Sequence, residues 1–468
     1  MHKSYFFVFV LALCSCHVGE DIKLNQFISN QKTQETLNLS NKKEHISHTW
    51  YEIFKDQDLN TLLNKAMNSN ISIAESIERL KQSRYAFSIN NVNSLPMLNA
   101  NANYNYSKTN NRLDVYNNID AFKVGFDASW EIDLWGKNKY ISDQYYELMK
   151  KAEYSLHDIK VTISAEIINN YINLRKSQEK LRIAKKNLTL QNDIFSSVSE
   201  KYKVGIADDL TFNQAMFTIE KTKASIPPLK QEIEKYKNAI AILIGCIPQE
   251  TPIDLDKFSK NITSKTFKYS VKTLYNLPLD IIKTRPDIRA TEQSVYTQNA
   301  ILNQAIADLY PNLSIAGSFG FISQNTSSLF ETRKQSYGYN PEFIIPIWQW
   351  GKLKNNVELQ KHIKDEYILN YNEAMLTALV ELKNAIYFVE EAYKTNKFTL
   401  SALNKMRNIL ILTKNKYENG LIEFTDLAQA EQDFLSAQNA YIESNAEILQ
   451  NIASFYKATG GGYNFKQY

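Results

Sequence analysis

The longest regular pattern of apolar and polar residues lies in the second half of the chain, between Phe343 and Asp426. No proline or glycine occurs between Gly351 and Gly420, and a helix of that length spans roughly 100 Å at about 1.5 Å per residue. Apolar residues recur in it at alternating steps of three and four. This heptad repeat predicts lengthwise packing on other helices. We call these positions the seam: Ile368, Tyr371, Met375, Ala378, Leu382, Ala385, Val389, Ala392, Asn396, Thr399, Leu403, Met406, Leu410, Thr413 and Tyr417.

The same pattern occurs a second time, earlier in the chain, with matched residues 215 positions apart (420 − 205, for example). A constant separation over so much of the chain indicates an internal duplication with few net insertions. The first copy has its own seam, from Leu156 to Tyr202. The matched pairs are Pro96 and Pro311, Trp135 and Trp350, Tyr202 and Tyr417, Gly205 and Gly420, Gln214 and Gln429, and Gly245 and Gly460.

Two stretches in each copy change to a period of two. In residues 98–106, every even position is apolar or aromatic and every odd position is Asn. Such alternation predicts strands with one apolar and one polar face, at about 97–108, 121–133, 312–323 and 335–347. Their length and aromatic content are typical of transmembrane β-strands. A small soluble sandwich is the alternative, but no other segment is left to cover the apolar faces.

Four strands cannot close a barrel, and a strand edge cannot stay unpaired in lipid. We therefore expect the strands to close by oligomerisation. Two chains would give eight strands with a filled interior, and three would give twelve strands around a lumen. The expected fold is mainly α, with long coiled-coil helical hairpins in two tandem repeats and four strands per chain in a shared membrane β-barrel.

The expected boundaries follow from these patterns. The first repeat spans 50–248, and the second spans 277–460 after a linker at 249–276; a tail at 461–468 follows. Helices are expected at about 51–91, 136–202 and 208–244 in the first repeat, and at about 286–309, 351–417 and 424–458 in the second.

The N-terminus has the features of an exported lipoprotein. A basic start precedes an apolar run of signal-peptide length, which ends in Leu13-Cys14-Ser15-Cys16. Lipoprotein signal peptidase cuts such a pattern, and Cys16 fits better than Cys14 because Ser15 is small. We expect a signal peptide at 1–15 and a leader at 16–49 that begins at a diacylated Cys16; an ordinary secretory signal is the alternative. Cys246 would be the other cysteine of the mature chain, so no intrachain disulfide is available.

The composition and the motifs argue against an enzyme. The formal net charge of +4 is close to balance, so no nucleic-acid partner is indicated. The chain has no Gly-rich phosphate loop, no Gly-x-Ser-x-Gly and no Cys-x-x-Cys. His45-x-x-His48 lacks a cysteine or acidic partner at ligand spacing, which favours a solvated loop over a metal site. We expect no enzyme activity, no metal and no cofactor besides the covalent lipid. No apolar stretch after the N-terminus is long enough for a transmembrane helix.

In this order, the features resemble the TolC-like outer-membrane efflux proteins, in their lipoprotein branch. The resemblance covers essentially the whole mature chain, although each motif alone is weak. Glu20 and Ile22 depart from the Pro and Tyr of the branch, which bears on the leader and not on the channel. The motifs are Cys16-His-Val-Gly-Glu-Asp21, similar to the branch's Cys-x-Val-Gly-Pro-Asp-Tyr, Arg285-Pro-Asp-Ile-Arg289, Tyr310-Pro-Asn-Leu313, Gly460-Gly-Gly-Tyr463, and the two Tyr-x-x-Gly turns at Tyr202 and Tyr417.

The resemblance implies a homotrimer with a twelve-stranded barrel in the outer membrane and a tunnel of helices in the periplasm. The lower end would dock on a periplasmic adaptor protein and an inner-membrane pump, and the cargo would be drugs, metals, dyes or other small toxic molecules. Two alternatives remain: a type I protein-secretion duct and a non-conducting, lipid-anchored coiled-coil spacer. The lipidated start favours efflux, and a spacer needs no strands.

The candidate site residues lie where each hairpin turns. Tyr202 and Tyr417 are the last bulky seam residues before Gly205 and Gly420, and we predict that the seams loosen there to open a gate. Acidic residues at the turns would form rings that favour cations. We also expect the adaptor to contact the turns around Gly205 and Gly420. The alternative for the tyrosines is ordinary end-of-seam packing, the alternative for the acidic residues is a solvated face, and the alternative for the glycine turns is a simple hairpin turn. The acidic residues are Asp208, Asp209, Glu423 and Asp426.

Overall fold

The computed structural model describes residues 18–22, 50–110, 116–257 and 280–461. The expected signal peptide, Cys16, most of the leader, most of the linker and nearly all of the tail lie outside these ranges. The chain divides into two compact units. We call residues 1–26, 79–153 and 290–372 the strand unit, and residues 27–78, 154–289 and 373–468 the hairpin unit; each is described by itself.

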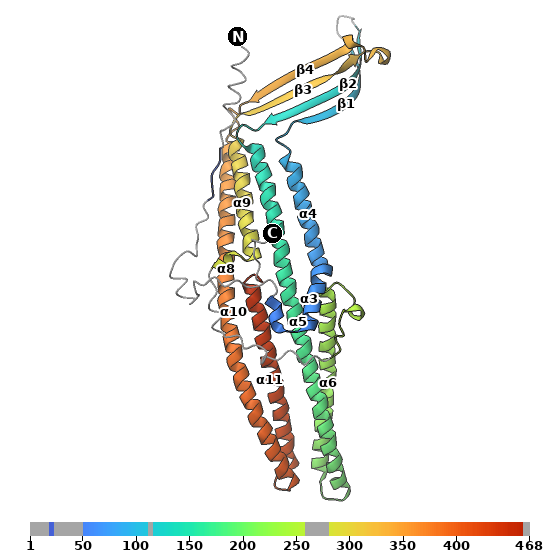
Figure 1. Cartoon of the computed structure of the whole chain (residues 1–468), viewed down its shortest axis with the longest axis vertical. Helices are drawn as coiled ribbons and strands as arrows, with labels where there is room; N and C mark the ends of the chain where they lie inside the picture. The colour runs from blue at the N-terminus through green and yellow to red at the C-terminus, as the bar shows by residue number, and fades with distance from the viewer. Residues whose placement is uncertain (1–17, 23–49, 111–115, 258–279, 462–468) are drawn as a thin grey trace. The chain divides into compact units, whose positions relative to one another are not determined.

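The strand unit contains one antiparallel sheet in the order β1-β2-β3-β4 (Figure 1). Its register places Ala100 opposite Phe126, Phe126 opposite Phe319, and Phe319 opposite Tyr337. The apolar positions of all four strands therefore share one face, as the period-two pattern predicts. The strands are β1 (Met97–Asn110), β2 (Tyr116–Ile132), β3 (Asn312–Ser323) and β4 (Gln335–Ile344). The strand expected to reach residue 347 stops at Ile344, close to Pro346, which has no N–H for a ladder.

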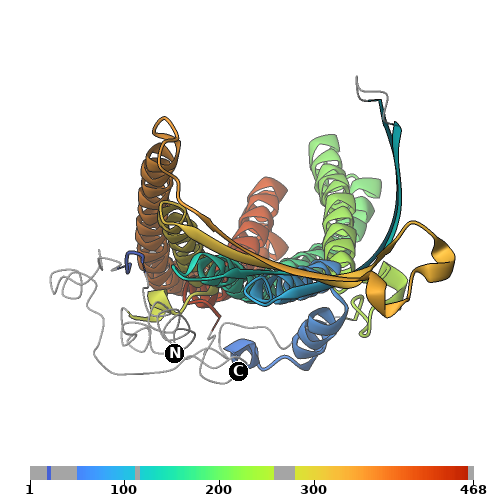
Figure 2. The ribbon, with the colours of Figure 1, turned by 90° about the horizontal axis from the view of Figure 1, so that it is seen from above.

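The sheet is curved (Figure 2), and a pair of glycines lies at a close approach between β2 and β3. Gly125 and Gly320 are direct partners. A methyl group built on Gly125 would lie 2.7 Å from Gly320 Cα, and one built on Gly320 would lie 2.8 Å from Gly125 Cα. No side chain fits between two backbones at that separation, so glycine on both strands permits the approach.

Eight α-helices are recorded in the described ranges, and α5 and α10 are each 67 residues long. The α-helices are α3 (Gln57–Ser69), α4 (Ile71–Asn91), α5 (Lys137–Lys203), α6 (Asp209–Leu243), α8 (Asp280–Lys283), α9 (Pro286–Ala307), α10 (Lys352–Glu418) and α11 (Phe424–Ala458). Short 3-10 turns are η1 (Trp50–Phe54), η2 (Pro248–Glu250), η4 (Thr326–Ser328) and η5 (Thr332–Lys334). Among these helices, none has an apolar window long enough to cross a membrane.

One expected helix is interrupted. Residues 51–91 form η1, α3 and α4, not a single helix: Lys55 (φ +49°) and the extended Asp56 separate η1 from α3, and Asn70 leaves the helical conformation between α3 and α4. Its side-chain oxygen accepts a hydrogen bond from Ile73 N at 2.9 Å, and its amide donates to the carbonyl of Leu243 at 2.7 Å. Asn70 therefore begins α4 as an N-cap and also ties α4 to the end of α6.

The predicted seam of α10 is confirmed, because all fifteen of its positions are buried or half-buried. The most buried run lies between Met375 and Ala392. The seam of α5 differs: around Ile167, Tyr171 and Leu174 the helix is buried on a broader face, while Tyr202 at its end is exposed. The two long helices thus share a length and a pattern but have different surroundings.

Candidate functional site: hairpin tips and an ion-paired junction

Each hairpin turns through the same backbone geometry. Gly205 has φ +78° and Gly420 has φ +69°, in the left-handed region that glycine adopts without strain. The N–H of Ile206 donates to the carbonyl of Lys201 at 2.8 Å, and the N–H of Leu421 donates to that of Lys416 at 2.9 Å. A Cβ atom on either glycine would meet nothing within 4 Å. The glycines therefore shape the turns and leave the adjacent surface open.

The first tip is closed by its own residues. The Tyr202 hydroxyl donates to Asp209 Oδ1 at 2.6 Å, and its ring stacks on Phe212 with centroids 4.8 Å apart. Asp208 is the N-cap of α6 and accepts from Thr211 N at 2.9 Å. Hydrogen bonds from the side chain and the backbone of Thr211 lower the pKa of Asp208, and the bond to Asp209 raises the pKa of Tyr202. Two of the four predicted acidic residues are therefore engaged within the turn.

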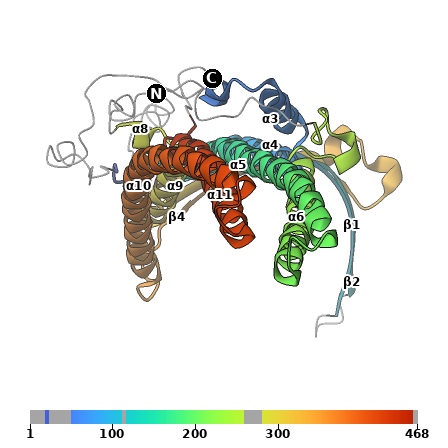
Figure 3. The ribbon, with the colours of Figure 1, turned by 90° about the horizontal axis from the view of Figure 1, so that it is seen from below.

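The second tip is held mainly by the first hairpin. Phe424, at the start of α11, is buried in a cluster with Val198 of α5 and Ala215 of α6. Tyr417 packs edge-on against Phe424, with centroids 5.9 Å apart, and Lys201 Nζ lies 5.3 Å from the centre of the Tyr417 ring. Tyr417, at the end of α10, therefore contacts the first residue of α11 and also packs against the first hairpin. Figure 3 shows α11 between α10 and the helices of that first hairpin, α5 and α6.

The cap of the second tip is incomplete. Glu423 occupies the N-cap position of α11, but its side chain makes no capping hydrogen bond. Asp426 lies in the first turn of α11 and is exposed. The hydroxyl of Thr425 reaches across to Gln214 Oε1 at 3.2 Å. A ring of acidic residues needs several chains, so the cation-favouring ring remains a prediction.

Glu431 was missed from the sequence. It lies on α11 about two turns beyond the tip, and burial raises its pKa to about 7, while Lys414 acts in the opposite direction. The residue at the matched position of the first copy is Met216. Met216 is itself 47% exposed, so this apolar counterpart does not mark position 431 as buried, and no local pattern in the sequence predicts the raised pKa of Glu431.

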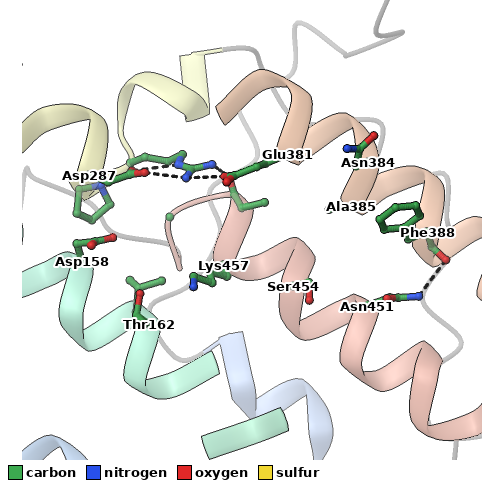
Figure 4. Close-up of a pocket in the computed structure, with 15 residues that line it drawn as sticks. Asp158, Thr162, Asp287, Glu381, Asn384, Ala385, Phe388, Asn451, Ser454 and Lys457 are labelled. Carbon is green, nitrogen blue, oxygen red and sulfur yellow. Dashed lines mark hydrogen bonds and ion pairs between the residues drawn. The ribbon is translucent and has the colours of Figure 1, made fainter. Parts of the chain in front are cut away.

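A second polar cluster in the hairpin unit surrounds Arg285. Its guanidinium pairs with Asp287 at 2.7 Å and Glu381 at 2.9 Å, and donates to the carbonyl of Ala458 at 3.1 Å. These residues line a cavity of about 560 Å³ between α5, α10 and α11 (Figure 4). Asp158 also lines it, and burial, together with the nearby charge of Asp287, raises its pKa. The Arg285 motif thus builds an ion-paired junction at the start of α9.

In the first copy, an uncharged residue makes the equivalent contact between two helix ends. Asn70 stands 215 positions before Arg285, and their acceptors, Leu243 and Ala458, are separated by the same 215 positions. Each side chain ties the start of one helix to the carbonyl at the end of another. The charged pairs to Asp287 and Glu381 are therefore an addition to a shared backbone contact.

A buried network joins α3 and α5 in the hairpin unit. The Tyr171 hydroxyl donates to Asp56 Oδ2 at 3.0 Å and accepts from Arg175 at 3.1 Å, and Arg175 also donates to the carbonyl of Lys257 at 2.7 Å.

Within the described ranges, no group of three or more His, Cys, Asp or Glu residues is placed to hold a metal ion. These clusters bind parts of the chain to one another.

The chain matches known proteins over nearly its full length. A family model described as outer membrane efflux protein matches residues 62–246 and 277–461, once in each copy. The chain is 24% identical over 419 residues to the solvent efflux pump outer membrane protein SrpC of Pseudomonas putida, which covers 89% of this chain and 88% of SrpC. It is 23% identical over 465 residues to the cation efflux system protein CusC of Escherichia coli, covering 98% of both. The solved CmeC outer membrane channel of Campylobacter jejuni has a TM-score of 0.87 at 23% identity, covering 97% of this chain and 96% of CmeC.

Proposed function

Because this chain belongs to the outer membrane efflux protein family and is an outer-membrane efflux channel, we propose that three copies close one twelve-stranded barrel. The observation that carries the proposal is the sheet order, in which β1 and β4 each have one partner strand among the described residues. Open edges invite pairing with further strands, and lipid does not tolerate them unpaired. Joining β4 of one copy to β1 of the next satisfies both edges in a closed ring.

The apolar face of the sheet supports a lipid environment. Tyr337 and Tyr339 are 82% and 84% exposed, and Phe126 and Phe319 share their face by register. A soluble sheet would cover such a row of aromatic residues. Trp348, exposed shortly after β4, is of the type enriched where membrane strands reach the interface.

The hairpin tips carry the proposed gate and the proposed contact with a periplasmic adaptor protein. We propose that Tyr417 leaves Phe424 and Lys201 when the second hairpin moves, and that acidic residues at the tips favour cations in the opening. Val204, Ile206 and Leu421 are exposed apolar residues beside the turning glycines. Apolar side chains at an exposed turn suit a protein contact, so the adaptor, with its inner-membrane pump, would dock there.

The cargo class follows from relatives. SrpC is named for solvent efflux and CusC for cation efflux. We propose that this channel passively conducts small toxic molecules or metal ions delivered by its pump, without catalysis. We further propose that Cys16 carries a lipid that anchors each copy to the outer membrane, and that no other cofactor is needed.

The native mass of the detergent-extracted protein tests the assembly. We expect three chains, each heavier than its sequence by a diacylglyceryl group on the N-terminal peptide, and single-channel conductance in a planar bilayer. A Cys16→Ser variant is the control for the lipid: its chains should lack the diacylglyceryl mass and keep the uncleaved signal peptide, because the peptidase cuts only before an acylated cysteine. A stable monomer without conductance would contradict the shared barrel.

A further inference from the structure

A short piece of the leader, Val18 to Ile22, is bound along the helices of the strand unit. The side chain of Asn303 on α9 pairs with both backbone groups of Glu20: it accepts from the N–H at 2.9 Å and donates to the carbonyl at 3.3 Å. Asn299, one turn earlier, donates to the same carbonyl at 3.2 Å. The Tyr140 hydroxyl of α5 donates to the carbonyl of Val18. The leader segment is therefore recognised through its backbone.

The Glu20 side chain adds a charge contact. Lys364 of α10 is only 12% exposed at its side chain, and its Nζ lies 3.3 Å from Glu20 Oε2. Glu20 is 60% exposed, so solvent screens its side of the pair. In the described part of the chain, Glu20 is the one acidic residue recorded within ion-pair distance of Lys364. The mostly buried ammonium group therefore takes its counter-charge from the leader.

The fit around the leader is close. A methyl group built on Gly19 would lie 2.9 Å from Tyr140 Cζ and 3.0 Å from Asn303 Cγ. Tyr140 and Asn303 are both buried. Removing the leader would leave the Asn303 amide without the partners seen here, and an unpaired buried polar group is costly. The surface is thus shaped for this segment.

We propose that these side chains form a binding site for the leader, which we call the clasp. Its residues are Tyr140, Asn299, Asn303 and Lys364. The clasp fixes the point from which the lipid anchor leaves the protein. This rests on the proposed lipidation of Cys16, two residues before Val18. Two extended residues span at most about 7 Å, so binding of Val18 at the clasp limits the distance between Val18 and the acylated Cys16 to about that length. The clasp also joins the two sequence repeats of one chain, since α5 belongs to the first repeat and α9 and α10 belong to the second.

Glu20 is the residue that adapts the leader to this site. Proline, the residue of the lipoprotein branch at this position, has no N–H to donate to Asn303 and no carboxylate for Lys364. The departure from the branch pattern at Glu20 therefore supplies two of the contacts described above.

The test is chymotrypsin cleavage of the leader after Leu24 or Phe27 in the full-length, detergent-extracted protein. We expect Glu20→Pro to speed cleavage about tenfold and Glu20→Gln a few-fold, since hydrogen bonds and a partly screened charge are lost. Asp21→Asn, which removes a neighbouring charge without a recorded hydrogen bond, is the matched control and should cleave at the original rate.

A charge exchange completes the test. Lys364→Glu alone should speed cleavage, and Lys364→Glu combined with Glu20→Lys should restore protection. Equal cleavage rates for Glu20→Pro, Lys364→Glu and the Asp21→Asn control would overturn the clasp. The mass of the N-terminal peptide separates the two proposals: if that peptide carries no lipid in the original protein but Glu20→Pro and Lys364→Glu still speed cleavage, lipidation fails and the binding site stands.

Discussion

The two hairpin tips share a turn and differ in what supports it. Gly205 and Gly420 adopt the same positive φ, and the same hydrogen-bond pattern closes each helix end. The first tip is completed by its own Tyr202, Asp209 and Asp208, whereas the second relies on the first hairpin through Phe424 and Tyr417. Duplication has preserved the backbone while the supports diverged. We infer that the first hairpin is the fixed element and the second is the one that moves.

Substitutions at Asn70 and Arg285 should give the largest difference in stability between the two copies. We expect Arg285→Ala to lower the free energy of unfolding by about 2–3 kcal/mol, because the Ala458 carbonyl loses a buried charged donor and the partly exposed Asp287 and Glu381 lose their ion pairs. Asn70→Ala should cost about 1–2 kcal/mol, since it removes a cap and one long-range hydrogen bond. Denaturant unfolding followed by circular dichroism measures both, and equal losses would contradict a special role for the charged pairs.

Glu431 and Met216 differ in pH dependence. The pKa of Glu431, about 7, exceeds its ordinary value of 4.5, so the native state holds the proton where the unfolded state has lost it. The contribution of Glu431 to stability is therefore fully present below about pH 4.5 and is lost as the pH rises through about 7. The loss is about 2 kcal/mol after allowing for partial exposure.

Glu431→Met, which copies the first hairpin, should remove this dependence and raise stability at neutral pH. Thermal unfolding between pH 5 and 8 measures it, with Glu431→Gln as a control for packing. A pH profile unchanged by both substitutions would show that another group titrates.

The tyrosines test which hairpin carries the gate. We expect Tyr417→Ala to raise the conductance of the closed channel about tenfold, corresponding to about 1.4 kcal/mol of lost contact with Phe424 and Lys201. Tyr202→Ala should change it less, because Tyr202 is bonded within its own turn. Planar-bilayer recordings measure both variants, with Tyr417→Phe keeping the ring. An equal rise for both would remove the distinction between a fixed and a moving hairpin.

The caps give the smallest effect. Glu423 makes no capping hydrogen bond, while the shorter Asp208 does. We expect Glu423→Asp to stabilise the second tip by up to about 1 kcal/mol and to reduce spontaneous channel openings. Asp208→Ala should lower the melting temperature by removing the first cap. Scanning calorimetry beside channel recording would check both, and destabilisation by Glu423→Asp would mean that the longer side chain has another role.

The sequence predicted the features that repeat along the chain. The seam, the strand alternation and the glycine turns each depend on local periodicity or on one backbone preference. The break at Asn70 was missed because its acceptor, the Leu243 carbonyl, lies 173 residues away and no proline or glycine marks the break. The contacts of Glu20 in the clasp could not be predicted either, since Asn303 lies 283 residues further along the chain. The exposed acidic residues at the tips remain predictions for the assembled channel.

The open sheet has a consequence for how each copy is made. Before assembly, a newly exported chain carries two available strand edges and a face of exposed aromatic residues. Such a surface is prone to aggregation in water. The helices depend on nearby contacts and can form early, but the sheet is safe only once its neighbours and the lipid are present. If three chains share the barrel as proposed, we expect biogenesis to depend on a periplasmic chaperone that shields the strands until the chains meet at the membrane. The supply of such chaperones, more than the stability of the helices, would then limit the yield of working channels.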